Sequence, residues 1–413
     1  MANKSLISCR CEGVRLVGDG LALGGIAKKH KAQDPSVINA TLGTLYDEQG
    51  NFYRMENVDK VIKNFNDDSF YQYSPSDGGA DFCNAAVNWV FGNELDKMSN
   101  SYIKCVATPG GTGAVNNALY ISLDPNETLL LPDLYWSPYL KMADVNKVNV
   151  TNYDMIIDNK FNLEGFKEKA LEIVNKEGKL VTILNDPCNN PTGYSLSEEE
   201  FDNLIEFLNS LNVPCTVVYD IAYFDYFVGG MELCRKKFSL MNKANENVLF
   251  NIAFSASKTF SIYGLRLGAE IFVSKNEEVV NEAYDIANCL ARTRWSNVNR
   301  AAVNLMVAVN KNSDLKEKVI NDIKEASALM QKRISLFNDE ANSIGLDIYP
   351  VTGGFFACVR CEDGYKLAEA LQKEKIYVLP FDKVIRIALC SIPCEEIKGL
   401  ASKIKKCIDK SIA

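Results

Sequence analysis

Residues 248–268 read VLFNIAFSASKTFSIYGLRLG, a mainly apolar run followed by a polar segment that contains one lysine. The run Val248–Phe254 lacks strict alternation of apolar and polar residues, which is typical of a strand covered on both faces. Lys258 therefore follows the carboxyl end of a strand, where open α/β sheets bind ligands. A lysine amine there can form a Schiff base with a carbonyl compound if burial or nearby positive charge lowers its pKa. A solvated lysine in a polar loop is the alternative interpretation.

Short apolar runs alternate with polar helical stretches over the whole region from about residue 100 to 275. Ser197 and Glu200 are predicted to form a capping box at the start of a helix that ends near Ser210. The alternation predicts an α/β protein whose mostly parallel, seven-stranded sheet lies between helices. Besides 248–254, the predicted strands are residues 103–107, 128–131, 147–150, 180–184, 216–219 and 269–273.

The pattern changes after residue 275, where a long helix is predicted from about Ser313. Beyond it the predicted elements are strands at 353–359, 376–379 and 384–389 and a helix at 364–373, which indicate a smaller α+β unit. The stretch before residue 45 has no core of its own, and we expect it to pack on this unit. The predicted divisions are residues 1–45 (N-terminal segment), 46–312 (large domain) and 313–413 (connecting helix and small domain).

Composition excludes several classes of function. The chain has 413 residues and a net charge of −8, which argues against nucleic acid as a partner. His30 is the one histidine, so a zinc site with several histidine ligands is impossible and no metal is expected. No apolar run approaches the length of a membrane span, and no secretory signal is apparent at the N-terminus. The odd number of cysteines, 13, fits free thiols in a reducing compartment, so we expect a cytoplasmic protein.

The segment around Lys258, S-x-S-K-x(5)-G-x-R-x-G, resembles the cofactor-lysine segment of class I and II aminotransferases, the fold-type I enzymes that depend on pyridoxal 5′-phosphate. Further segments between about residues 39 and 390 fall in the family's order, and the similarity is closest to the aspartate and aromatic branch. The resemblance implies a homodimer with active sites at its interface. It makes Lys258 the cofactor's attachment point and the general base, and it places Ser255, Ser257 and Arg266 at the phosphate.

A glycine-rich turn at residues 108–114 follows one predicted strand and leads into a helix. Glycines let the backbone approach a phosphate, whose charge is favoured by the N–H groups and dipole of a helix start. The resemblance assigns phosphate contacts to Gly111 and Thr112. Relatives often carry alanine or a small hydroxyl residue where this chain has Gly110, so a side-chain contact is lost there.

Three more segments resemble those that hold the cofactor ring. Trp136 stands at the place of the aromatic residue that stacks on the flat pyridine. Asp220 follows an apolar strand and would pair with the protonated ring nitrogen. In the N-P-T-G sequence at 190–193, Asn190 would donate to the phenolic oxygen together with Tyr223. The alternatives are a core tryptophan, a capping aspartate and a plain turn. Lys258, Asp220 and Tyr223 are the predicted catalytic residues.

The candidate substrate residues include two arginines. Arg386 aligns with the family residue that clamps the α-carboxylate, and an arginine in an apolar strand is costly without such a partner. Arg292 resembles the arginine that reaches across the dimer to a distal carboxylate, although Arg294 competes and a solvated arginine is the alternative. Gly43 resembles a backbone contact near the substrate, which Asn190 and Trp136 are also expected to touch.

Two further aromatic residues, Tyr73 and Tyr139, occupy positions with a role in the family. Tyr73 resembles the tyrosine that is sent to the neighbouring subunit's phosphate, but Tyr71 competes with it. Tyr139 stands where aspartate-branch relatives commonly carry histidine, so the residue that orients Asp220 differs here.

We therefore predict a pyridoxal-phosphate-dependent aminotransferase that moves an amino group between an L-amino acid, with aspartate or glutamate favoured, and a 2-oxo acid such as 2-oxoglutarate. An aromatic amino acid aminotransferase is one alternative. A fold-type I lyase or decarboxylase would share the cofactor residues. A regulator that only binds the cofactor would carry an added basic DNA-binding domain, for which the motif-bearing region leaves no room.

Overall fold

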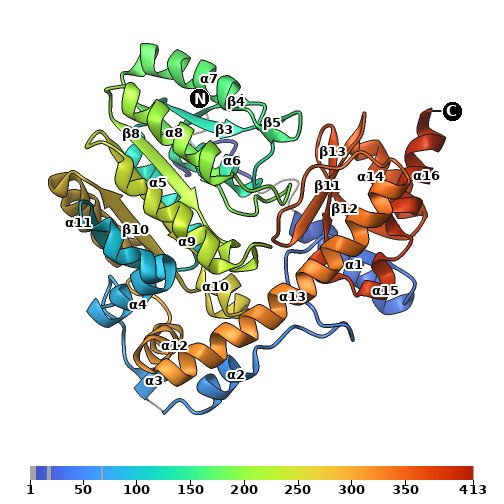
Figure 1. Cartoon of the computed structure of the whole chain (residues 1–413), viewed down its shortest axis with the longest axis horizontal. Helices are drawn as coiled ribbons and strands as arrows, with labels where there is room; N and C mark the ends of the chain where they lie inside the picture. The colour runs from blue at the N-terminus through green and yellow to red at the C-terminus, as the bar shows by residue number, and fades with distance from the viewer. Residues whose placement is uncertain (1–5, 16–19, 67, 413) are drawn as a thin grey trace.

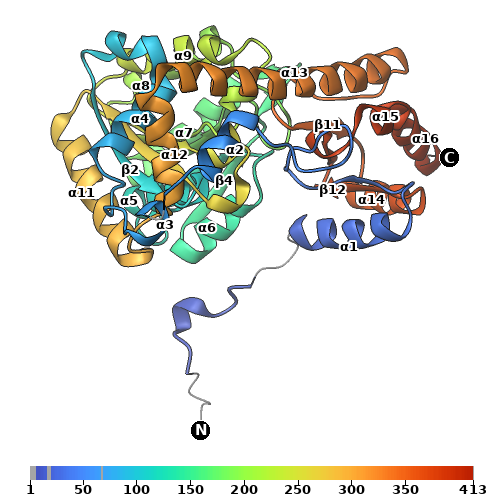
Figure 2. The same ribbon diagram turned by 90° about the horizontal axis from the view of Figure 1, so that it is seen from below.

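Two sheets of unequal size organise the protein. The computed structural model describes residues 6–15, 20–66 and 68–412. A seven-stranded sheet forms the centre of a large lobe, and a four-stranded sheet forms the centre of a smaller one. The helix α13 Ser313–Ser343 begins where it is predicted and runs from one lobe to the other (Figure 1). The same helix follows one side of both lobes in the perpendicular view (Figure 2).

The large sheet has the predicted mostly parallel character. Strand β10 runs antiparallel to both of its neighbours, whereas the other neighbouring pairs are parallel. The predicted seven-stranded sheet is therefore confirmed. In spatial order its strands are β2 Tyr102–Thr108, β10 Gly268–Ser274, β9 Val248–Phe254, β8 Cys215–Asp220, β7 Leu180–Asn185, β3 Thr128–Pro132 and β4 Asn149–Tyr153.

Helices cover both faces of this sheet, which explains why β3, β7, β9 and β10 are buried along their whole length. In β3, Leu129 and Leu131 point into the core on one face and Leu130 into the core on the other. The first face is covered by α5 Gly111–Ser122, α6 Pro138–Asn146 and α11 Glu277–Arg294, and the second by α4 Ala80–Phe91, α7 Leu163–Glu177, α8 Glu198–Ser210 and α9 Met231–Ser239.

Some element boundaries lie where the sequence predicts them, whereas residues with a left-handed backbone shift others. Ser197 Oγ accepts from the Glu200 N–H, and the Glu200 carboxylate accepts from the Ser197 N–H, so the predicted capping box is confirmed. The strand predicted from residue 147 begins two residues later, because Lys147 has a left-handed backbone that ends α6. The strand predicted from Gly353 begins at Phe356, because Gly353 and its neighbour have positive φ and form a turn.

The smaller sheet includes a strand from the N-terminal part of the chain. Its order is β1 Ile38–Ala40, β12 Ile376–Pro380, β13 Val384–Ala388 and β11 Phe356–Arg360, with β1 parallel to β12. Helix α1 Gly20–Gln33 packs against β1 and β12 (Figure 2). Helices α14 Gly364–Lys373, α15 Cys394–Ile397 and α16 Leu400–Ile412 complete this lobe.

The remaining elements are short connections. They are α2 Glu56–Lys63, α3 Asp68–Tyr71, α10 Ala256–Thr259, α12 Arg300–Lys311, the hairpin β5 Ile156–Ile157 and β6 Lys160–Phe161, and the 3-10 helices η1 Cys9–Cys11, η2 Gly92–Met98, η3 Phe224–Tyr226, η4 Leu240–Lys243, η5 Tyr263–Leu265 and η6 Leu389–Ser391. Within the described residues, every helix is too short or too polar to span a bilayer. All 13 cysteines lie in the described ranges as free thiols.

Candidate active site

The carboxyl ends of the parallel strands meet at one edge of the large sheet and form a cavity there. Asn185 is the last residue of β7, Asp220 is the last residue of β8, and Ser255 follows β9. The cavity is lined by Gly111, Thr112, Trp136, Asn185, Asn190, Asp220, Ala222, Tyr223, Ser255, Lys258 and Arg266. A second cavity continues from it toward the small lobe and adds Thr41, Leu42, Gly43, Phe356, Leu379 and Arg386.

Lys258 lies where the two cavities meet. Its Nζ donates to the Gly43 carbonyl oxygen at 3.0 Å and lies 4.9 Å from the centre of the Tyr263 ring. Burial lowers the pKa of Lys258 to about 8, and the positive charges of Arg266 and Arg386 act in the same direction. A larger fraction of the amine is therefore neutral near pH 7 than for an exposed lysine, as a nucleophile or general base requires.

Asp220 lies at the inner wall of the cavity. Burial raises the pKa of its carboxyl group to about 6, while hydrogen bonds from Tyr139 and from the Ala222 N–H oppose this rise. Tyr139 Oη donates to Oδ2 at 2.5 Å, and the Ala222 N–H donates to Oδ1 at 3.0 Å. The carboxylate is thus mostly ionised at neutral pH and suited to pair with a cationic group in the cavity.

An anion-binding cradle forms at the start of α5. Gly110 precedes the helix with φ of +77°, and Gly111 and Thr112 of the first turn line the cavity, where a helix start leaves N–H groups without intrahelical partners. Arg266 Nη1 donates to Ser257 Oγ at 3.0 Å, which holds the guanidinium beside this turn. A Cβ atom on Gly110 would lie 2.3 Å from Arg266 Nη2. Glycine at this position therefore makes room for the arginine, which gives a physical reason for the departure from the family pattern.

Arg386 points from β13 into the second cavity. Nη1 donates to Asn190 Oδ1 at 2.9 Å, and Nη2 donates to the Thr41 carbonyl oxygen at 2.6 Å. Nε is buried and has no hydrogen-bond partner in the structure. No ion pair among the described residues involves Arg386, although the residue is only 7% exposed. A buried cation without a counter-ion favours an anionic ligand beside it.

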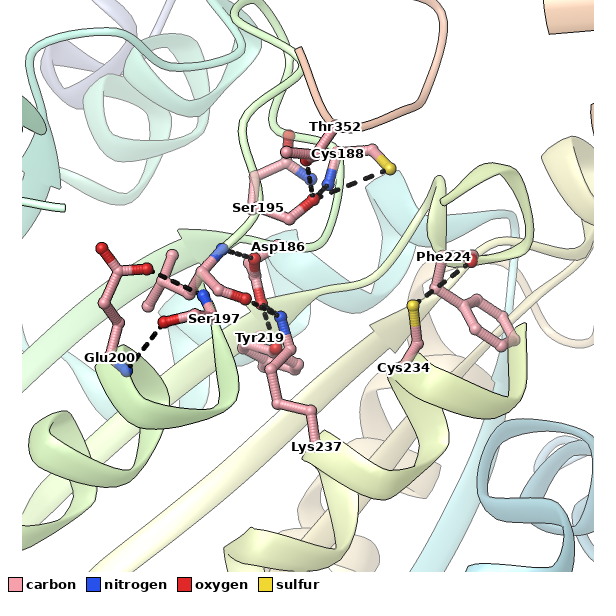
Figure 3. Close-up of polar contacts among 12 residues, drawn as sticks. Asp186, Cys188, Ser195, Ser197, Glu200, Tyr219, Phe224, Cys234, Lys237 and Thr352 are labelled. Atoms are coloured by element: carbon pink, nitrogen blue, oxygen red, sulfur yellow. Dashed lines mark hydrogen bonds and ion pairs between the residues drawn. The ribbon is translucent and has the colours of Figure 1, made fainter. Parts of the chain in front are cut away.

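A buried ion pair between Lys237 and Asp186 holds the loop that carries Asn190. Figure 3 shows Lys237 reaching Asp186 next to Tyr219, whose hydroxyl also donates to this carboxylate. The other carboxylate oxygen of Asp186 accepts from the Leu196 N–H at 2.7 Å, so Asp186 joins both ends of the loop. The Asn190 N–H donates to Asn185 Oδ1 at 2.6 Å. These contacts fix the loop against the ends of β7 and β8.

We expect Lys237→Met to lower the free energy of unfolding by about 3–5 kcal/mol, because it leaves the Asp186 carboxylate buried without its cation. The two side chains are 5% and 1% exposed. Urea unfolding measures the effect. The matched control is Lys243→Met, which breaks a more exposed pair with Asp202 and should change the value by less than about 1 kcal/mol. Equal changes in the two variants would contradict the anchoring role.

The structure brings most of the predicted site residues together, with three exceptions. Ser257 is buried behind Arg266 and does not line the cavity. Tyr73 is 87% exposed and lies outside both cavities. Arg292 is also exposed and donates to Ser296 Oγ at 2.7 Å, while the competing Arg294 donates to Asn117 Oδ1.

Sequence reasoning missed several cavity residues, among them Asn185 and Tyr263. Asn185 directly follows the predicted strand 180–184, and that position was the available signal. Tyr263 lies within the lysine segment, but its distance to Lys258 depends on the left-handed turn at Ser261. The hydrogen bond between Tyr139 and Asp220 joins residues 81 positions apart; the family position of Tyr139 was the available signal, but it did not indicate that a tyrosine donates there.

Comparison with known proteins identifies the family. Residues 36–404 match the family model for aminotransferase class I and II. The chain belongs to this family. The enzymes of this family depend on pyridoxal 5′-phosphate, so this is the cofactor against which the cavity has to be judged.

Relatives of known name are aspartate and aromatic aminotransferases. The chain is 26% identical over 269 residues to aspartate aminotransferase of Pseudomonas aeruginosa, covering 64% of this chain and 65% of that protein, which is just under two thirds of its length. It is 22% identical over 333 residues to the aromatic-amino-acid aminotransferase of Escherichia coli, covering 78% and 81%.

Solved aminotransferase structures share the whole fold. An aminotransferase from Anaerococcus prevotii superimposes with a TM-score of 0.93 at 29% identity, covering 98% of this chain and 100% of that one. An aromatic-amino-acid aminotransferase from Burkholderia pseudomallei, covalently bound to pyridoxal phosphate, gives a TM-score of 0.80 at 19% identity, covering 97% and 100%. The fold is therefore that of the fold-type I aminotransferases, with a large domain built on a mostly parallel seven-stranded sheet and a smaller α+β domain.

The residues in the cavity fit the family's cofactor. A phosphate suits the cradle at the start of α5, where Gly110 and Arg266 leave N–H groups and a guanidinium for an anion. A basic ring nitrogen suits Asp220, and an aldehyde suits the amine of Lys258. No side chain at the cavity requires a ligand of a different chemistry.

Proposed function

We propose that the protein is a pyridoxal-phosphate-dependent aminotransferase that transfers the amino group of L-aspartate or L-glutamate to a 2-oxo acid such as 2-oxoglutarate. One observation carries this proposal: the Lys258 amine lies between an anion cradle at Arg266 and the unpaired cation of Arg386. Such a site offers one place for a phosphate, one for a carboxylate, and an amine between them.

The cofactor supplies an aldehyde carbon that reacts with amines and a ring that accepts the electron pair released at the substrate's Cα. Lys258 first binds the cofactor through Nζ. Once the substrate amine has taken its place, the freed Nζ would act as the general base that removes the proton from the substrate's Cα and as the general acid that gives it up again. The lowered pKa of Lys258 favours the neutral amine that this step needs.

The remaining cavity residues position the reactants in this proposal. Arg386 holds the α-carboxylate with its guanidinium, next to Asn190. Asp220 pairs with the ring nitrogen, Trp136 packs on the face of the ring, and Tyr223 donates to its phenolic oxygen together with Asn190. The phosphate group is held by Gly111, Thr112, Ser255 and Arg266, whose guanidinium donates to Ser257 behind it, and the Gly43 backbone lies beside the substrate.

We further infer that the enzyme is a homodimer whose active sites lie at the interface. Tyr73 and Arg292 are exposed and outside the cavities of their own chain, so each needs a second copy to reach a ligand. Phe70 and Tyr71 beside Tyr73 are exposed aromatic side chains, which a partner surface would cover. We also propose that the chain divides into an N-terminal segment (residues 1–45), a large domain (46–312) and a connecting helix with the small domain (313–413).

A preference for aromatic amino acids is the second candidate. Leu42, Phe356 and Leu379 form an apolar wall of the second cavity. The basic residues among those that line it are Lys258, Arg266 and Arg386, all of which have roles other than holding a distal carboxylate. This wall favours an apolar substrate side chain unless Arg292 of a second copy enters the cavity.

Arg292→Ala tests the substrate preference. We expect kcat/KM for aspartate with 2-oxoglutarate to fall about 100-fold and that for phenylalanine to change less than about threefold, because one arginine–carboxylate pair is lost. Arg54→Ala, an exposed arginine outside both cavities, is the control. If the wild-type enzyme prefers phenylalanine and Arg292→Ala affects both substrates equally, the preference for dicarboxylic substrates is wrong.

A further inference from the structure

Glu270 is a fully buried carboxylic acid in β10 to which the proposed mechanism gives no role. Its register partner in β9, Ala253, packs in the core under α5, so Glu270 lies on that face of the sheet. Oε2 accepts from Asn117 Nδ2 of α5 at 3.1 Å, and Oε1 accepts from Asn251 Nδ2 of β9 at 2.9 Å. One carboxyl group therefore joins α5, β9 and β10.

The same three elements carry the residues of the phosphate cradle. These residues are Gly111 and Thr112 at the start of α5, Ser255 directly after β9 and Arg266 before β10. The elements approach closely there, since a Cβ atom on Gly268, the first residue of β10, would lie 2.5 Å from the carbonyl carbon of Gly110. A shift of one element therefore displaces its neighbours and changes the shape of the cradle.

Arg294 determines which way the Asn117 amide faces. Arg294 Nη1 donates to Asn117 Oδ1 at 2.8 Å. Because a guanidinium can only donate, the amide must turn its oxygen toward Arg294 and its Nδ2 toward Glu270. The side chain at position 270 must therefore offer an acceptor to α5.

The charge state of Glu270 suits a place behind an anion site. Burial raises the pKa of Glu270 to about 8, although the hydrogen bonds from Asn251 and Asn117 and the charge of Arg294 act in the opposite direction. The carboxyl group is therefore mostly neutral near pH 7. It can join the three elements without placing a full negative charge behind a bound phosphate.

We propose that Glu270 is a positioning residue for the cofactor phosphate: its carboxyl group joins α5, β9 and β10 so that the groups of the cradle converge on one anion. This inference rests on the proposed function, because it assumes that the cradle binds a phosphate. Glu270 does not line either cavity, so it acts through the elements that it joins.

Glu270→Leu tests this role when the apoprotein is titrated with pyridoxal 5′-phosphate and, separately, with pyridoxal, which lacks the phosphate. We expect the Kd for pyridoxal 5′-phosphate to rise about tenfold or more, because hydrogen bonds to a charged group are weakened. The Kd for pyridoxal should change less than about twofold. Absorbance measures both affinities, and circular dichroism gives the folded fraction. Equal losses for the two ligands would overturn the inference, because general damage to the fold affects both.

Glu270→Gln is the conservative variant that should restore binding. The glutamine oxygen can accept from Asn117, and its Nε2 can donate to Asn251 Oδ1, which is buried without a partner, once the Asn251 amide has turned over. We expect a Kd for pyridoxal 5′-phosphate within about threefold of the wild-type value. A loss as large as that of Glu270→Leu would overturn the inference.

Asn117→Ala and Thr182→Val complete the set of variants. Asn117→Ala removes only the contact with α5 and should show the same selective loss, so the test does not depend on the folding of Glu270→Leu. Thr182→Val is the matched control, because it removes a buried hydrogen bond to the Leu130 carbonyl oxygen in the same sheet and should leave both Kd values unchanged. Wild-type affinities in Asn117→Ala and Glu270→Leu would overturn the inference.

Calorimetry with inorganic phosphate distinguishes this inference from the proposed function. A wild-type apoprotein that binds phosphate but not pyridoxal 5′-phosphate would overturn the proposed function, while Glu270→Leu should still weaken the binding of phosphate. A wild-type apoprotein that binds neither ligand would overturn both.

Discussion

Replacement of Lys258 by alanine is expected to reduce transamination by at least about 10⁴-fold. The same amine binds the cofactor and moves the proton at the substrate's Cα, and general base catalysis alone contributes about 10² to 10⁴. Burial and two nearby arginines prepare this amine by lowering its pKa to about 8. Single-turnover absorbance of the loaded enzyme with aspartate measures the effect, since cofactor and amino acid can still combine slowly without the lysine.

Reduction with borohydride gives an independent readout. It should fix the cofactor to Lys258 in the wild-type enzyme, and mass spectrometry of the peptide identifies the modified residue. Lys366→Ala, which removes an exposed lysine of α14, should retain both the reducible yellow complex and full activity. A Lys258→Ala protein that still forms such a complex would show that another amine holds the cofactor.

Arg386→Ala is expected to lower kcat/KM by about 10³-fold for every amino acid substrate, whatever its side chain. Removing one partner of a buried charge pair costs about 2–5 kcal/mol, and here the α-carboxylate would lose the buried guanidinium that holds it. Arg386→Lys should recover only a small part, because a lysine cannot offer two parallel donors. Initial rates with aspartate, phenylalanine and alanine measure the effect.

The affinity for the cofactor distinguishes the role of Arg386 from that of Lys258. Arg386 lies in the second cavity, away from the phosphate cradle, so the Kd for pyridoxal 5′-phosphate should change less than about threefold. Arg360→Lys is the control, since Arg360 pairs with Asp347 outside both cavities. A loss confined to dicarboxylic substrates would mean that Arg386 binds the distal carboxylate instead.

The sequence was informative where local patterns decide the structure. The run Val248–Phe254 has the burial that its composition predicts, and the helix beginning at Ser313 has the predicted start. Strand starts fell within one residue of their predicted places, except in β4 and β11, where the left-handed residues Lys147 and Gly354 moved them by two and three residues. Those shifts depend on backbone conformations that no apolar pattern reveals.

The site was predictable only in part. Residues next to strand ends could be placed at one edge of the sheet, because parallel strands bring their carboxyl ends together. The hydrogen bond from Tyr139 to Asp220, the buried pair of Lys237 with Asp186 and the unpaired Nε of Arg386 are properties of the packed fold. Such contacts join distant segments, so residue spacing carries no information about them.

The close approach of Gly110 and Arg266 has a consequence for how related sequences can differ. The space that a side chain at position 110 would need is filled by the guanidinium. A serine there could add a hydroxyl to the cradle, but only after Arg266 had swung to a new rotamer. A side chain at position 110 and the present place of the Arg266 guanidinium therefore exclude each other.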